Sequence, residues 1–131
     1  MSVATEAVVT NTAKTKMVKA RAGLASLPAI VGMAFGDGAV TGSTIRTPLA
    51  TDTALQHQLL RQVIDSATLQ QDNISVLYAC TLAKATLAGE NINEIALYDS
   101  DGDLVCIKSF SNKGKDSDME MEFSILDKFS E

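Results

Sequence analysis

One hairpin signal constrains the fold of this chain more than any other feature of its sequence. Residues 92–107 read INEIALYDSDGDLVCI, with β-branched and apolar residues on both sides of Asp101-Gly102. An Asp-Gly dipeptide between two such runs is a strong short-range signal for a β-hairpin, because glycine adopts a positive φ without steric cost. We therefore predict strands over residues 92–98 and 103–110, joined by a tight turn, and antiparallel β-structure in the second half of the chain.

Three further segments carry strand patterns. Residues 29–35 form an apolar run without helical length, which predicts a buried strand. Residues 63–69 and 74–82 predict a second hairpin, closed by the polar residues 70–73. Residues 119–126 alternate between apolar and polar, as is typical of a strand with one packed and one solvated face. The predicted packed positions are Ile74, Val76, Tyr78, Cys80 and Leu82 in the hairpin, and Met119, Met121, Phe123 and Ile125 in the last strand.

Two segments in the N-terminal half carry a helical spacing. In residues 11–25, Ala13, Met17, Ala20 and Leu24 fall on one stripe, and Thr10 or Asn11 is a suitable N-cap. In residues 52–62, apolar side chains recur every four residues, which also predicts a helix. Between the predicted strand 29–35 and this second helix lies a long glycine-containing loop that ends near Thr51. Together these patterns predict an α+β fold, in which two helices from the N-terminal half pack on a mainly antiparallel β-sheet, and a single domain over residues 1–131.

Charge is distributed unevenly along the chain. Residues 1–48 carry five basic and two acidic groups, whereas residues 49–131 carry six basic and fourteen acidic groups, for a net charge of −5. An acidic chain without tryptophan argues against nucleic-acid binding, which usually requires a basic face with base-stacking side chains. No apolar run approaches the length of a membrane span, and residues 1–9 do not resemble a signal peptide. We therefore expect synthesis in the cytoplasm and no membrane partner.

Residues that carry chemistry are sparse. The two cysteines, Cys80 and Cys106, lie in predicted strands without metal-ligand or redox spacing, so we interpret them as buried reduced thiols. The single histidine, His57, lies off the apolar stripe of its predicted helix and is expected at the surface. No Ser/His/Asp or Cys/His arrangement is evident in the sequence. We therefore expect a protein that is not an enzyme and that has neither a cofactor nor a catalytic residue.

Two motifs superficially resemble ligand-binding loops. Gly36-Asp37-Gly38 lacks the spacing of a phosphate-binding loop and is interpreted as a turn. Residues 99–103 (DSDGD) resemble the start of a calcium loop, but the predicted strands close too soon for an EF-hand. We interpret this segment as a polar hairpin tip, with an adventitious cation site as the alternative. No metal site is expected otherwise.

Several sequence motifs, taken in order, resemble the bacteriophage tail-collar fibre family, the N-terminal region of phage tail fibre proteins. The most specific are the Gly-Asp-Gly turn and the acidic hairpin motif E-I-x-L-Y-D-x-D-G. The resemblance extends over nearly the whole chain. The matching stretches are TNTAK (10–14), KARAG (19–23), MAFGDG (33–38), LLR (59–61) and INEIALYDSDGDLV (92–105).

The resemblance implies a structural role in a virion or prophage. Domains of this family are similar to the module that attaches a fibre to the phage tail or baseplate, and such fibres are commonly trimeric. The resemblance therefore implies tail or baseplate proteins as partners and a homo-oligomer, with a trimer expected. The sequence ends at Glu131 without a glycine-rich shaft or receptor-binding tip. We expect either a short adaptor or the anchoring part of a longer fibre.

Partner contacts are expected from charged side chains of the N-terminal half. The predicted helix 11–25 presents a basic face, and the loop from Gly36 to Pro48 carries two more charges; a merely solvated helix face is the alternative. A small carbohydrate- or ligand-binding module is the alternative function, although 5% aromatic residues and no tryptophan are few for a sugar site, and a hydrolase is the least favoured class. The predicted contact residues are Lys14, Lys16, Lys19, Arg21, Asp37 and Arg46.

Overall fold

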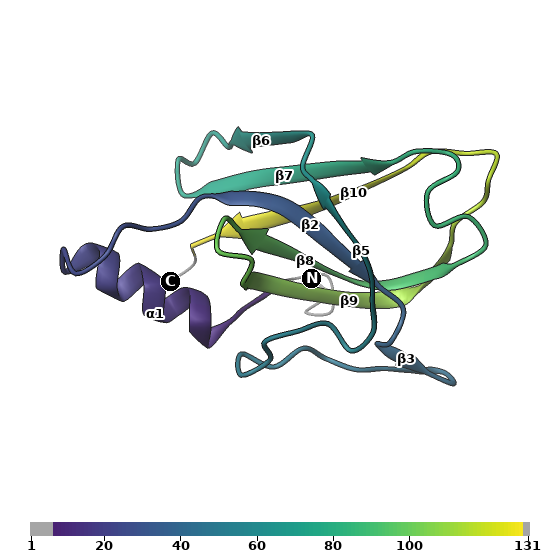
Figure 1. Cartoon of the computed structure of the whole chain (residues 1–131), viewed down its shortest axis with the longest axis horizontal. Helices are drawn as coiled ribbons and strands as arrows, with labels where there is room; N and C mark the ends of the chain where they lie inside the picture. The colour runs from purple at the N-terminus through teal and green to yellow at the C-terminus, as the bar shows by residue number, and fades with distance from the viewer. Residues whose placement is uncertain (1–6, 130–131) are drawn as a thin grey trace.

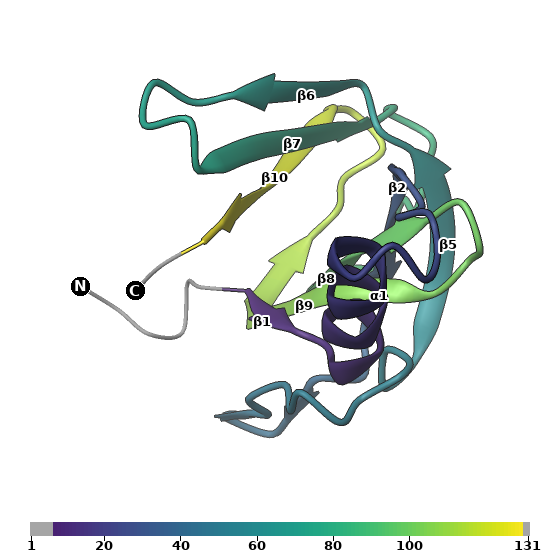
Figure 2. The same cartoon turned by 90° about the vertical axis from the view of Figure 1, so that its left-hand side faces the viewer.

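The computed structural model describes residues 7–129, which form two larger antiparallel β-sheets packed face to face and a separate two-stranded antiparallel sheet within residues 40–45. A five-stranded sheet has the order β1-β9-β8-β2-β5, and a three-stranded sheet has the order β10-β7-β6. Figure 2 shows them as two layers, with β6, β7 and β10 facing the larger sheet. The elements are β1 (Val8–Val9), α1 (Asn11–Arg21), β2 (Ile30–Gly36), β3 (Val40–Thr41), β4 (Thr44–Ile45), β5 (Gln58–Val63), β6 (Ser66–Leu69), β7 (Ser75–Leu82), β8 (Asn91–Asp99), β9 (Leu104–Gly114) and β10 (Met121–Lys128).

The main core lies between the two sheets. Phe35 of the larger sheet meets Phe123 of the smaller one edge to face, with ring centroids 5.3 Å apart. Cys80 and Cys106 are fully buried free thiols, as the sequence predicted. Burial raises the pKa of Cys80 to about 11 and that of Cys106 to about 12, so both remain protonated at neutral pH. The core consists of side chains that point inward from the strands of both sheets. They are those of Met33, Phe35, Cys80, Leu82, Ile92, Ile95, Leu97, Cys106, Phe123 and Ile125.

The predicted acidic hairpin is present as β8 and β9. The Asp99 amide donates to the Asp103 carbonyl at 3.0 Å, and Gly102 adopts a φ of 90° at the tip. The second predicted hairpin is also confirmed, as β6 pairs with β7 in the register Leu69↔Val76. The Asp-Gly turn signal therefore located the first hairpin, and the apolar alternation of residues 74–82 located the second.

The predicted α+β class with two helices packed on a sheet is wrong, because the described part of the chain is mostly β-strand and holds one helix. Residues 58–62 of the predicted second helix (52–62) instead lie in β5, an edge strand paired with β2. A four-residue spacing is also a multiple of two, so Leu59 and Val63 fit one face of a strand as well as one face of a helix. The pairing of this segment with β2 decides in favour of the strand, and the sequence pattern carries no information on that pairing.

A related correction concerns the predicted strand 63–69. The chain leaves the larger sheet after Val63 and enters the smaller sheet at Ser66. Val63 is therefore the last residue of β5, and only residues 66–69 of the predicted strand form β6. Leu55, which we assigned to the second helix, instead lies in a loop. It packs with Ala34 and Ala96 in a second cluster on the outer face of the larger sheet.

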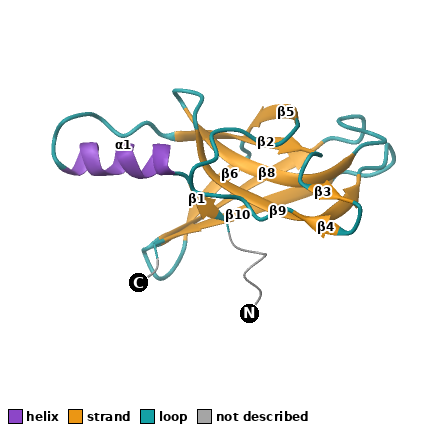
Figure 3. Cartoon of the chain, turned by 90° about the horizontal axis from the view of Figure 1, so that it is seen from below, coloured by secondary structure: helices purple, strands orange, loops and turns teal. Residues whose placement is uncertain are grey.

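The remaining helix, α1, begins at a buried cap. Thr10 accepts a hydrogen bond from the Ala13 amide through its side-chain oxygen and donates one to the Leu104 carbonyl. Gly23, with a φ of 75°, follows its last turn, so the helix ends before the predicted residue 25. Figures 1 and 3 show α1 beyond one end of the strands, not layered on a sheet. No described helix is long and apolar enough to cross a membrane.

Candidate functional site

The carboxyl end of β2 is closed by a buried carboxylate. Glu94 of β8 lies opposite Gly36 in the sheet and is 2% exposed. Its side-chain oxygens accept hydrogen bonds from the backbone amides of Gly38, Gln56 and His57, each at 2.9 Å. A carboxylate that accepts several backbone N–H groups is well stabilised despite its burial. Glu94 therefore joins two loops to the centre of the larger sheet.

The neighbouring Asn93 completes this junction. Its side-chain oxygen accepts from the Ala39 amide at 2.9 Å, and its side-chain nitrogen donates to the Asp37 carbonyl at 3.0 Å and to the Asn112 side chain at 2.9 Å. A Cβ on Gly36 would lie 2.5 Å from the His57 carbonyl oxygen. The Gly-Asp-Gly and Asn-Glu motifs, far apart in the sequence, thus contact each other directly.

The acidic hairpin tip holds a side chain of the same chain. The Lys16 ammonium lies 2.7 Å from Asp99, 3.0 Å from Asp101 and 2.8 Å from Asp103. Partial burial lowers the pKa of Lys16, but its hydrogen bonds to the three carboxylates outweigh this effect and hold the pKa above the ordinary lysine value. The three carboxylates lie close enough together to hold a metal ion. However, the position that the alternative cation would take is occupied by Lys16.

Two other predicted contact residues also form ion pairs within the chain. Asp37 lies 2.5 Å from His57 Nδ1, and this hydrogen bond raises the pKa of the exposed imidazole. Arg46 forms a two-pronged pair with Asp52 at 2.8 and 2.9 Å, which raises the pKa of Arg46 and lowers that of Asp52. His57 is at the surface, as expected.

The remaining predicted contact residues, Lys14, Lys19 and Arg21, are exposed on α1. The structure therefore does not bring the six predicted residues together in one site. Their role in partner binding stays a prediction.

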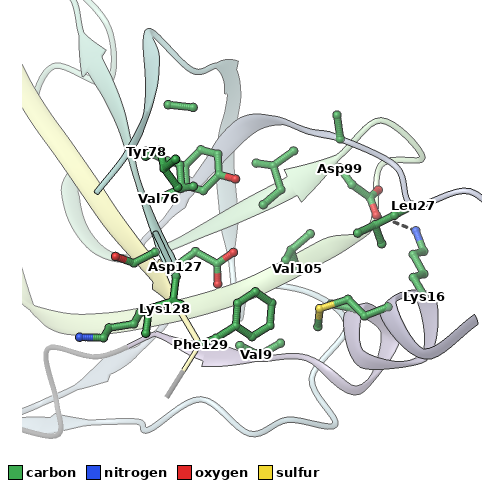
Figure 4. A pocket seen from close by; sticks show the side chains of 18 of the residues that line it. Val9, Lys16, Leu27, Val76, Tyr78, Asp99, Val105, Asp127, Lys128 and Phe129 are labelled. Carbon is green, nitrogen blue, oxygen red and sulfur yellow. Dashed lines mark hydrogen bonds and ion pairs between the residues drawn. The ribbon is translucent and has the colours of Figure 1, made fainter. Parts of the chain in front are cut away.

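An open apolar groove, which the sequence did not predict, lies at the amino end of β2. Its volume is about 510 Å³, and its walls come from α1, the segment leading into β2, the β6–β7 hairpin, β9 and the end of β10 (Figure 4). Four of its large apolar side chains are exposed: Leu27 (54%), Leu69 (60%), Ile74 (49%) and Phe129 (66%). Ile74, predicted on the packed face, instead lies in the turn before β7.

Two polar side chains point into this groove. Asp127 continues the inward-facing row of Phe123 and Ile125, and Tyr78 lies opposite Ile125 on β7. Figure 4 shows the Asp127 carboxylate and the Tyr78 hydroxyl directed into the cavity, with no interaction marked for either. Desolvation raises the pKa of both groups, and the nearby Asp127 charge adds to the shift of Tyr78.

Sequence reasoning missed the groove because its walls come from segments that are distant in the sequence. The available signal was indirect. Asp127 stands at a position where the alternation of residues 119–126 would place an apolar side chain. A charged residue at the next position of a packed face indicates that the strand leaves the core there.

Comparison with known families agrees with the motif order. The model of the family described as phage tail-collar fibre protein, N-terminal, matches residues 1–124. No curated protein and no solved structure matches the chain. The family match confirms the resemblance. The family is structural, not enzymatic, and the match indicates a component of the phage tail that associates with other tail proteins in the virion. The chain thus belongs to the phage tail-collar fibre family and corresponds to its N-terminal domain.

Proposed function

We propose that this domain attaches a fibre to the phage tail or baseplate and that the apolar groove is its docking surface. The observation that carries the proposal is the gathering of Leu27, Leu69, Ile74 and Phe129, all exposed, around a single groove. Contiguous exposed apolar surface marks protein-interaction sites on soluble domains. A structural tail protein needs such a surface and needs no reactive group.

Charged side chains extend the proposed surface. Lys14, Lys19 and Arg21 are exposed on α1, the helix that forms one wall of the groove. We propose that they contact the acidic surface of a tail protein at the rim, where charges guide association more than they add affinity. Lys16 takes part through its position in the wall, because its ammonium is held by the hairpin tip. Asp37 and Arg46 are proposed as minor contacts, since each already has a partner.

Aromatic side chains favour protein docking over carbohydrate binding. Phe35 and Phe123 are buried in the core, and Tyr98 is covered by the Arg61 guanidinium, 4.8 Å above its ring. Among the described aromatic residues, Phe129 alone is exposed. A sugar platform usually requires an accessible ring face with polar groups around it. We expect the purified chain to bind no glycan on a glycan array and the protein to remain attached to the phage tail.

Gene replacement in the encoding phage tests the proposal. A double variant, Leu69→Ser with Ile74→Ser, removes two apolar groove side chains; Val63→Ser, at a similarly exposed position on β5 outside the groove, is the control. We expect tails of the double variant to lack the protein by immunoblotting and electron microscopy, and the control to incorporate it normally. Normal incorporation of a folded double variant would refute the groove as the docking surface. Light scattering of the purified chain tests the expected trimer.

A further inference from the structure

We infer that the groove receives a lysine or arginine side chain, flanked by apolar residues, from a segment of a partner polypeptide, and that Asp127 is the residue that pairs with this cation. The inference rests on the proposed docking function and adds the chemistry of the partner. It follows from the charges that face the groove, from the shape of its walls and from the position of Asp127 in β10.

Asp127 lies in a row of inward-facing side chains that are otherwise apolar. It lies opposite Val76 in the β10–β7 pair and follows Phe123 and Ile125 along the inward face of β10. Removing a carboxylate from water is unfavourable unless a partner compensates. The raised pKa of Asp127 has desolvation as its sole cause, which means that no described residue offers that compensation. A cation from outside the described chain would supply it.

The basic side chains nearest to the groove are already engaged. The Lys16 ammonium is held by the three carboxylates of the hairpin tip. Lys128 also lines the groove, but its ammonium lies 3.6 Å from Asp72. Because Lys128 follows Asp127 directly in β10, its Cβ leaves the strand on the opposite face. The groove therefore presents a carboxylate that has no counter-ion among residues 7–129.

The other groups of the groove fit a long basic side chain. Val76 and Val105 provide apolar surface beside Asp127, which suits the methylene stem of lysine or arginine. The Tyr78 hydroxyl points into the same space and can accept a hydrogen bond from the cation. Leu69, Ile74 and Phe129 at the rim provide contacts for the apolar residues next to it. A carboxylate and an apolar channel would instead exclude an acidic segment.

Selection from a library of random displayed peptides tests this inference on the whole chain. We expect peptides enriched on the wild type to contain lysine or arginine next to apolar residues. The affinity of such a peptide should fall about tenfold for Asp127→Asn and about tenfold when its basic residue is replaced by methionine. The two changes together should cost little more than either alone, because they remove the same contact. Glu122→Gln, a matched change on the solvated face of β10, should leave the affinity unaltered.

Three outcomes with the purified chain would overturn the inference. One is enrichment of peptides without a basic preference, or of none; another is equal affinity for the wild type and Asp127→Asn. The third is self-association of the wild-type chain in sedimentation that is lost on Leu69→Ser with Ile74→Ser, since a second copy would then cover the groove. The inference fails alone if the double variant loses tail attachment while phage carrying Asp127→Asn assemble normally. Normal assembly of both variants would refute the proposed docking surface as well.

Discussion

The two ends of strand β2 lie in opposite environments. At its carboxyl end, Gly36 faces the buried Glu94, whose carboxylate accepts three backbone hydrogen bonds. At its amino end, Ile30 faces an open apolar groove that also contains the Asp127 carboxylate, which has no partner among the described residues. Each end holds a carboxylate that is partly or fully removed from water, but only the carboxylate at the closed end, that of Glu94, receives hydrogen bonds from described residues.

This difference separates residues that stabilise the fold from residues available to a partner. A buried carboxylate with a full set of donors joins distant segments and would be costly to replace. A half-buried carboxylate without donors weakens the isolated domain and becomes favourable only when a partner supplies a cation. Substitutions at the closed end should therefore reduce stability, whereas substitutions at the open end should reduce binding without reducing stability.

The largest expected effect is that of Gly36→Ala at the closed end. The new Cβ would lie 2.5 Å from the His57 carbonyl oxygen and 2.6 Å from a Glu94 side-chain oxygen, so backbone must move. We expect the free energy of unfolding, measured with urea, to fall by about 3 kcal/mol. In the control Gly114→Ala, the nearest atom would be 3.6 Å away, and a change within about 0.5 kcal/mol is expected. Equal stability of the two variants would contradict the close packing at Gly36.

A smaller loss is expected for Glu94→Gln, which keeps the shape of the side chain. The amide nitrogen of glutamine cannot accept the backbone N–H groups that one carboxylate oxygen now binds. We expect a loss of about 2 kcal/mol in urea unfolding, because buried donors lose their acceptor. Glu90→Gln, at an exposed position, provides the matched control. If both variants are equally stable, Glu94 does not hold the closed end together.

A third prediction concerns the link between α1 and the hairpin tip. Lys16→Met leaves Asp99, Asp101 and Asp103 without their shared cation, and we expect a loss of about 1 kcal/mol at neutral pH. The pKa of Lys16 is raised in the folded state, so its contribution is fully present below its ordinary value of 10.5 and is lost as the pH rises toward the folded-state value. Lys14→Met, an exposed change on the same helix, is the control.

Calcium sharpens this third test. Calcium should raise the melting temperature of Lys16→Met, in which the three carboxylates no longer bind an ammonium group. It should not raise the melting temperature of the wild type. A calcium response of the wild type would mean that Lys16 does not occupy the acidic cluster in solution.

The smallest effect, and one of opposite sign, is expected for Asp127→Asn in the free domain. The pKa of Asp127 is raised in the folded state, so its charge opposes folding above that pKa, and the penalty is relieved as the pH falls. The variant should therefore be as stable as the wild type or up to about 0.5 kcal/mol more stable at pH 7. Any gain should vanish as the pH approaches the ordinary value of 3.8. A clear loss of stability at pH 7 would show that Asp127 has an internal partner and would remove the contrast between the two ends.

Much of the β-structure, but little of the candidate site, could be predicted from the sequence. Asp101-Gly102 located its hairpin because turn preferences act between neighbouring residues. The same local reasoning could not find where the Lys16 side chain lies, because its three partners are more than eighty residues away. Nor could it find the groove, whose walls are brought together only when the two sheets pack and α1 is held at their end.

The sequence by itself determined the turns, the alternating strands, the buried cysteines and the order of motifs that marks the family, since these depend on residues close together in the chain. Only the tertiary structure decided that residues 58–63 are a strand, that backbone amides satisfy Glu94, and that no residue in the described part of the chain pairs with Asp127. The physical reason is that strand pairing and the compensation of a buried charge depend on groups that folding brings from distant parts of the chain.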